Sequence, residues 1–230
     1  QVEELYNLKA DPEEVNNLAE SDSKEVQDRL GRMRSALDKW EKRIKDVGFL
    51  PEWEIHNRSK GSSPYEVGHD PARYDFDSIY AAAKLASSMR QNDLPAIARL
   101  MASRDSAIRY WGAVGLLAQG KAAIETGQSQ LRAALKDDSP IVQITAAEAL
   151  GRFGDSNDQA AALKTLISYA GAEANPYLRI AAWNSIDYLK EHPRRALVTL
   201  RRIPAEPYRS ERLGNLVPDL KRQTMADLQA

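Results

Sequence analysis

The stretch SPIVQITAAEAL, residues 139–150, is the segment that decides the fold. Ser139 suits the N-cap of a helix and Pro140 suits the first helical position. Two other stretches align with it without gaps, DSAIRYWGAVGL at 105–116 and NPYLRIAAWNSI at 175–186. Their starts lie 34 and 36 residues apart, a spacing typical of helical-repeat solenoids.

Small residues recur on one face of these three helices, four and seven residues after the first apolar position. They are Gly112, Ala146 and Ala182, followed by Gly115, Ala149 and Ser185. Small side chains let neighbouring helices approach closely. The sequence therefore predicts close packing between consecutive repeats.

A second amphipathic segment precedes each of these stretches, at roughly 94–102, 129–135 and 159–169. A fourth pair is predicted at 194–203 and 208–228, and a leading helix at 75–89. A single repeat cannot bury its own apolar face, so an array of several repeats is expected.

The order of a cap, an Ile/Val-Arg pair, small residues and a leucine resembles HEAT repeats. Arg109 and Arg179 match the arginine of that pattern, and Gln143 departs from it. The resemblance implies an all-α fold, with residues 75–230 forming a right-handed α-α superhelix.

The first 50 residues form a separate segment with three expected elements. Val2 to Leu8 could be a short strand, and Asp11–Pro12 has the features of a helix start. A second helix is expected from Asp22, with Glu25 at capping-box spacing, and to stop at Gly48. Its apolar stripe consists of Val26, Leu30, Met33, Leu37, Trp40, Ile44 and Val47.

Two alternatives exist for this stripe: packing against the rest of a domain, or forming a free coiled-coil dimer. Packing is favoured because about three heptads are near the minimum for a coiled coil. Residues 51–74 show no periodicity and are expected to be a linker or packed loop. Trp53, Tyr65 and Tyr74 would pin parts of it to the surface.

Residues 4–19, ELYNLKADPEEVNNLA, closely resemble the C-terminal signature of type I sulfatases, roughly E-L-Y-D-L-x-x-D-P-x-E-x-x-N-L. GFLPE at 48–52 and SPYE at 63–66 are similar to a sulfatase subgroup with a helical repeat extension. The resemblance implies a segment that leaves the last strand of a small sheet and enters a closing helix. It also implies that the chain is the C-terminal piece of a secreted or periplasmic bacterial sulfatase, with that catalytic domain as its partner.

No residue of this chain matches the catalytic motif of that family, Cys/Ser-x-Pro-x-Arg. The chain has no cysteine, and its closest string, Ser62 to Glu66, has glutamate in place of the arginine. The family's calcium ligands and its active-site His and Lys belong upstream. The resemblance therefore implies no catalytic residue, cofactor or metal in this chain, and calcium only in the catalytic domain.

Composition gives little support for nucleic-acid binding, membrane insertion or metal binding. A net charge of −1 gives no electrostatic argument for nucleic acid or membrane partners. No apolar run approaches the ~20 residues that a membrane span needs. His56, His69 and His192 are the only histidines and do not pair at metal-ligand spacing.

An interaction surface is the kind of site that this sequence supports. Trp111 and Tyr177 would be binding residues if they face outward from the repeat helices. A basic cluster near the C-terminus could contact a protein or a sulfated glycan, because arginine binds sulfate bidentately. Its arginines are Arg194, Arg195, Arg201, Arg202, Arg209 and Arg212. The alternative function is an independent HEAT-repeat scaffold for protein–protein interaction.

Overall fold

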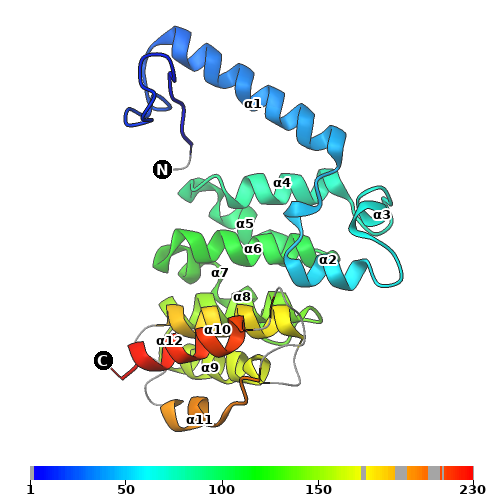
Figure 1. Ribbon diagram of the computed structural model, residues 1–230, viewed down its shortest axis with the longest axis vertical. Helices are drawn as coiled ribbons and strands as arrows, with labels where there is room; N and C mark the ends of the chain where they lie inside the picture. Colours follow the sequence, from blue (N-terminus) through cyan, green and yellow to red (C-terminus); the bar gives the residue numbers. More distant parts are fainter. Residues whose placement is uncertain (1–2, 172–174, 190–195, 207–212, 214, 230) are drawn as a thin grey trace.

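The chain folds as a stack of helices, with one long helix at the N-terminal end (Figure 1). This computed structural model describes residues 3–171, 175–189, 196–206, 213 and 215–229. No strand occurs among these residues, so the all-α prediction is confirmed.

Helix α4 (Phe76–Ala86) leads the stack, and four helix pairs follow it. The pairs are α5 (Leu94–Leu100) with α6 (Ser106–Gln119), α7 (Lys121–Ala134) with α8 (Pro140–Phe153), α9 (Ser156–Ala170) with α10 (Pro176–Tyr188), and α11 (Leu197–Arg202) with α12 (Leu216–Asp227). Helices α4, α6, α8, α10 and α12 pack on one another in chain order. The predicted side-by-side stacking of consecutive repeats is therefore confirmed.

The three repeat helices begin at the predicted N-cap residues, and two of these residues cap their helix through the side chain. Asp105 accepts a hydrogen bond from Ala107 N, and Asn175 accepts one from Tyr177 N. Ser139 occupies the N-cap position of α8, but its side chain does not bond to its own helix. Pro140 and Pro176 both stand in the first turn, where a missing N–H costs nothing.

The small residues allow the close packing that their positions predict. A Cβ added at Gly115 would lie 2.8 Å from the Ile97 Cγ2 atom and 3.0 Å from Ala86 Cβ. A Cβ at Gly112 would lie 2.8 Å from Met101 Cγ. Helix α6 thus approaches α4 and α5 more closely than alanine would permit. One continuous apolar core runs through the array, with fully buried side chains that include Ile97, Leu116, Leu150, Leu166, Trp183 and Ile186.

The predicted strand over Val2 to Leu8 and the helix starting at Asp11 are both wrong for the described residues. Residues 3–23 contain only turns and irregular backbone. The Asp11 carboxylate accepts hydrogen bonds from the backbone of Val15 and Asn16, and Glu14 adopts a positive φ of 53°. Asp side chains compete with helix formation in this way, because they offer the backbone a local partner.

Helix α1 (Lys24–Ile44) is the predicted second helix with shifted ends. It begins after Ser23, so the Asp22–Glu25 capping box is wrong. It ends at Lys45, which adopts the left-handed conformation, and Gly48 lies in the following 3-10 turn η1 (Val47–Phe49). Leu30 is the only buried residue of the helix, so α1 contributes little to the core.

Short helices replace much of the expected linker. Helix α2 (Glu52–Arg58) and helix α3 (Pro64–Gly68) follow η1, and a further 3-10 turn, η2 (Gln91–Asp93), precedes α5. Tyr74 is buried and Trp53 packs against the array core, as predicted. Tyr65 is 72% exposed, so the prediction that it pins the segment is wrong.

Candidate interaction site

Helix α2 lies against the N-terminal ends of three consecutive repeat helices, α6, α8 and α10. Arg58 contacts α6, Glu54 contacts α8 and His56 contacts α10. The repeat period brings these three helix ends to one edge of the array. A single short helix from the linker therefore touches three repeats.

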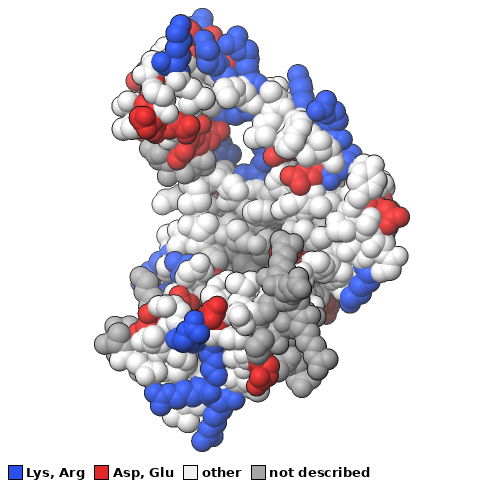
Figure 2. All heavy atoms as spheres, viewed as in Figure 1, with Lys and Arg blue, Asp and Glu red and all other residues white. Residues whose placement is uncertain are grey.

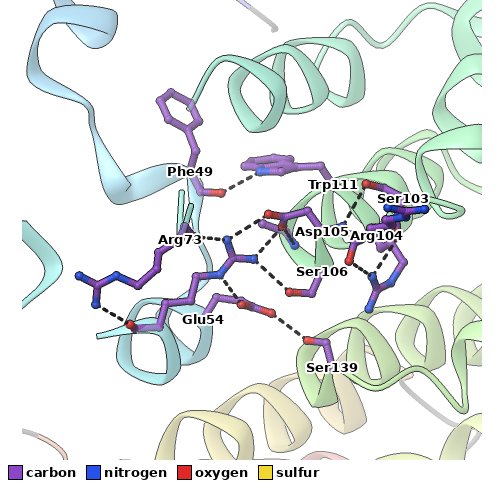
Figure 3. Close-up of polar contacts among 12 residues, drawn as sticks. Phe49, Glu54, Arg73, Ser103, Arg104, Asp105, Ser106, Trp111 and Ser139 are labelled. Carbon is purple, nitrogen blue, oxygen red and sulfur yellow. Dashed lines mark hydrogen bonds and ion pairs between the residues drawn. The ribbon is translucent and has the colours of Figure 1, made fainter. Parts of the chain in front are cut away.

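Arg58 is the centre of this contact, and its partners Glu54, Arg73, Asp105 and Ser106 are labelled in Figure 3. Its guanidinium donates to both carboxylate oxygens of Asp105 at 2.7 and 3.1 Å, and to the Ser106 hydroxyl at 3.1 Å. It also donates to the backbone carbonyl of Arg73 at 2.8 Å and to Glu54 at 2.8 Å. The side chain is only 13% exposed, so these bonds replace nearly all of its hydration.

Glu54 is buried to 2% exposure and has two partners. It accepts a hydrogen bond from Arg58 Nε at 2.8 Å and one from the Ser139 hydroxyl at 3.0 Å. This second bond directs the Ser139 hydroxyl toward Glu54, and the side chain does not cap its own helix. The carboxylate beside the N-cap residue of α8 also lies where negative charge is stabilising.

The predicted interaction residues Trp111 and Tyr177 are both engaged by the segment that contains α2. The Trp111 indole Nε1 donates to the Phe49 carbonyl at 2.8 Å (Figure 3). Tyr177 stacks on His56, with ring centroids 4.3 Å apart and an interplanar angle of 13°. Both aromatic side chains thus hold a part of the chain itself against the array edge.

The charges of this network reinforce one another. Burial works to lower the pKa of the Arg58 guanidinium, but the hydrogen bonds with Asp105 and Glu54 outweigh it and raise this pKa. Burial works to raise the pKa of Asp105, and the hydrogen bond from Arg58 overrides it, so that pKa is lowered. Both groups are therefore held in their charged forms.

Between the first two repeats, the arginine of the HEAT-like pattern forms an ion pair. Arg109 donates to both oxygens of Asp137 at 2.7 Å and to the carbonyls of Ser103 and Arg104. Gln143, at the same position of the next repeat, donates to the Asp137 carbonyl of its own repeat and accepts from the Tyr169 hydroxyl of the following one at 3.0 Å. Arg179 is buried and faces the carbonyls of Pro204 and Glu206. This position therefore connects neighbouring repeats.

The predicted basic cluster lies partly outside the described residues. Arg194, Arg195, Arg209 and Arg212 belong to the parts of the chain that the structure does not describe, as does His192. Arg201 and Arg202 are exposed on α11, at the end of the array opposite to α1 (Figure 1). A glycan contact at this cluster stays a prediction.

The second exposed feature is the apolar stripe of α1. Met33, Leu37, Trp40 and Ile44 are 55%, 52%, 48% and 39% exposed. The two ends of the stripe are covered: Leu30 is buried and Val26 is half-buried beside the coil of residues 3–23, and Val47, past the end of α1, packs against a buried cluster. The expected packing of the whole stripe does not occur within the described chain. Large side chains exposed in a row mark an interaction surface.

Charges of opposite sign flank this stripe. Arg29, Arg32, Lys39 and Arg43 form an exposed basic row along one side of α1. The N-terminal coil carries exposed Glu3, Glu4, Glu13 and Glu14. Figure 2 shows basic side chains along the upper edge, over α1, and acidic ones gathered over the coil below it.

Next to the stripe, α1 faces α4 across a cleft of about 720 Å³, and Leu37 of the stripe also lines this cleft. Asp38 bridges the cleft by accepting hydrogen bonds from the Tyr80 hydroxyl at 2.5 Å and from Lys84 Nζ at 2.8 Å. These bonds, first that from Lys84, lower the pKa of Asp38. They are the main direct link between α1 and the array.

Other sequence candidates have local structural roles. Ser63 and Glu66, from the string compared with the sulfatase nucleophile motif, form the capping box of α3. His69 Nδ1 lies 2.8 Å from the Tyr65 carbonyl. Among the described residues, no group of His, Cys, Asp and Glu side chains has a metal-binding arrangement.

Membrane insertion has no candidate element in the described part of the chain. None of its helices combines the length and the apolar composition that a bilayer crossing requires.

Sequence reasoning missed Glu54, His56 and Arg58 as contact residues. Their i, i+4 charge pair is compatible with a helix, but nothing in the local sequence names the partners, which lie 85 residues away for Glu54 and further still for His56. The signal that was present is the recurrence of caps at Asp105, Ser139 and Asn175. It locates the edge of the array without showing what covers it.

Capped helix pairs that stack in chain order and bond through a recurring polar position define an α-helical repeat protein. The sequence pattern described as HEAT repeats matches residues 94–187 and 129–212, which together span about half of the chain. The chain therefore belongs to the HEAT-repeat family.

One relative has an annotated activity. The chain is 41% identical over 70 residues to an ulvan-active sulfatase from Formosa agariphila. This match covers 30% of the chain and 11% of that sulfatase. No solved structure matches the chain significantly.

Proposed function

We propose that this chain is the helical-repeat accessory domain of a longer sulfatase and that residues 3–44 dock onto its catalytic domain. The observation that carries the proposal is the exposed stripe of Met33, Leu37, Trp40 and Ile44 on α1. A helix with so much apolar surface in water needs a partner, since burying each such side chain is worth about 1.5–3 kcal/mol.

The sequence around this helix supports a sulfatase as the source of that partner. Residues 4–19 resemble the sulfatase C-terminal signature, and the 70-residue match is to a sulfatase. The parent protein would hydrolyse sulfate esters, of sulfated sugars in particular, and would be periplasmic or secreted. Calcium and the nucleophile would belong to its catalytic domain, while this chain would provide structural support and an interaction surface.

The charge pattern beside the stripe favours a protein partner. An anionic membrane would attract the basic row of α1 but repel the acidic coil next to it. A protein surface can carry charges of both signs in the matching arrangement. We therefore infer that the partner has an apolar groove with an acidic rim opposite Arg32, Lys39 and Arg43.

Hydrogen exchange of the complete gene product tests this function. If the reading frame encodes a catalytic domain with Cys/Ser-x-Pro-x-Arg, α1 amides should exchange much more slowly there than in the 230-residue chain. Leu37→Ser with Trp40→Ser should remove that protection. Asp28→Ser, on the opposite side of α1, is the matched control and should retain it.

Two results would contradict the proposal. A reading frame without a sulfatase region would leave the independent HEAT-repeat scaffold as the function. Equal exchange of α1 in both proteins would show that the stripe is not the docking face.

A further inference from the structure

We propose that α2 is a clamp that joins the N-terminal segment and the first three repeats into one rigid body. The docking surface is the edge formed by the N-terminal ends of α6, α8 and α10, and its ligand is the face of α2 that carries Glu54 and Arg58. The inference concerns the chain itself and does not depend on the proposed sulfatase parent.

The array edge has a chemistry that suits such a helix. Each helix N-terminus presents unpaired N–H groups and a partial positive charge. Asp105 compensates the end of α6 and still has both carboxylate oxygens available for Arg58. The Ser139 hydroxyl at the end of α8 instead donates to Glu54. The edge therefore offers the Asp105 carboxylate to a cation and, one repeat further on, the Ser139 hydroxyl to an anion.

Helix α2 presents the complementary groups with the right spacing. Glu54 and Arg58 are four residues apart, so they lie on the same face of the helix and pair with each other at 2.8 Å. Each of them then reaches a different repeat. The neighbouring His56 adds the stacking contact with Tyr177 at the start of α10.

Both ends of the clamp are also fastened. Before α2, the Phe49 carbonyl accepts from Trp111, and the Asp46 carbonyl accepts from the Tyr74 hydroxyl. After α2, the Arg73 carbonyl accepts from Arg58. Of these three bonds, the one from Trp111 reaches the array, and the other two hold the segment between α1 and α4 together internally.

The direct contacts between α1 and the array are weaker than this clamp. The Asp38–Lys84 and Lys42–Asp77 ion pairs are exposed, and such pairs contribute little to stability. The Tyr80 hydroxyl adds one sheltered bond to Asp38. The pairs around Arg58 are far less exposed, with Glu54 fully buried, and breaking a buried pair is strongly destabilising. The orientation of α1 relative to the array is therefore set mainly by α2.

Spin-label distance measurements test the clamp directly. The chain has no cysteine, so Asp28→Cys on α1 and Lys164→Cys on α9, both exposed, allow specific labelling. The otherwise unchanged chain should give a single narrow distance distribution. Glu54→Gln combined with Arg58→Met should broaden it while the helix content by circular dichroism stays the same.

Two further variants serve as controls. Lys60→Met removes an exposed charge just after α2 and should leave the distribution narrow. Asp38→Asn removes the charge that pairs with Lys84 in the main direct link between α1 and α4, and should broaden the distribution less than the clamp variant does.

A narrow distribution in the folded clamp variant would overturn the proposal, as would a broader distribution in Asp38→Asn than in the clamp variant. If the clamp variant does not fold, Ser139→Ala with His56→Ala replaces it. This pair keeps Glu54 and Arg58 paired while removing the contacts to α8 and α10. Broadening in that variant supports the clamp, and an unchanged distribution refutes it.

Discussion

Arg58 on α2 and Asp105, the N-cap residue of α6, form a two-bonded ion pair across 47 positions of sequence. Asp105 has two roles in this pair, because it also accepts a hydrogen bond from Ala107 N at 2.7 Å and so starts the first repeat helix. The residue that begins the repeat array is thus also the residue that anchors the N-terminal segment.

Glu54→Ala should destabilise the chain by about 1.5–3 kcal/mol, because Arg58 Nε and the Ser139 hydroxyl lose their acceptor while Asp105 still pairs with Arg58. Urea unfolding measures this change. Glu52→Ala, an exposed glutamate of the same helix, should cost about 0–1 kcal/mol. Equal losses in the two variants would contradict the assigned role of Glu54.

Gly112→Ala should destabilise by about 1–3 kcal/mol, because the new methyl group would collide with Met101 and Leu100 of the neighbouring segment. Thermal unfolding is the measurement. The control is Gly31→Ala on α1, where a Cβ meets nothing within 4 Å. It should be neutral or stabilise by up to about 1 kcal/mol, since alanine has the higher helix propensity. A neutral Gly112→Ala would show that the helices can separate freely.

Lowering the pH should reduce the stability that the Arg58–Asp105 pair contributes. The Asp105 carboxyl has a folded-state pKa below its ordinary value of about 3.9, because its hydrogen bond from Arg58 outweighs the effect of burial. Its stabilising contribution is then complete above about pH 4 and is lost as the pH falls through the lowered pKa. Asp105→Asn should therefore be less stable than the native chain at pH 7, and the gap should shrink toward pH 2. Parallel stability curves would contradict this linkage.

Leu37→Ser and Trp40→Ser should each change the stability of this chain by no more than about 0.5 kcal/mol, because their side chains are half exposed. Leu116→Ala, in the array core, should cost about 2–5 kcal/mol. Chemical unfolding of the three variants compares them. A large loss in either α1 variant would mean that the stripe is part of the core and not a free surface.

Local signals in the sequence were sufficient for the repeat array. Caps at Asp105 and Asn175, proline in the first turn and small residues on one face all act within a single helix and its next neighbour. Such signals recur, so each copy supports the interpretation of the others. Predicted helix boundaries were wrong where side chains made other bonds. The helix predicted from Asp11 does not form, because its carboxylate binds the backbone of Val15 and Asn16.

Sequence reasoning predicted the residues that the repeat helices contribute to the candidate site, but not those that α2 contributes. The sequence predicts Trp111 and Tyr177 as binding residues if they face outward from the repeat helices, and the structure shows that both contact the segment around α2. Their partner could not be foreseen, because Phe49 and His56 are ordinary residues in a stretch without periodicity.

By itself, the sequence determined that this protein is a helical-repeat array, because caps and packing faces depend on residues close together in the chain. The tertiary structure alone decided that α2 covers the array edge and that most of the α1 stripe stays exposed. Those outcomes depend on which distant groups meet. The burial of Glu54 and Arg58 is stable only where Asp105 and Ser139 come within hydrogen-bonding distance of them.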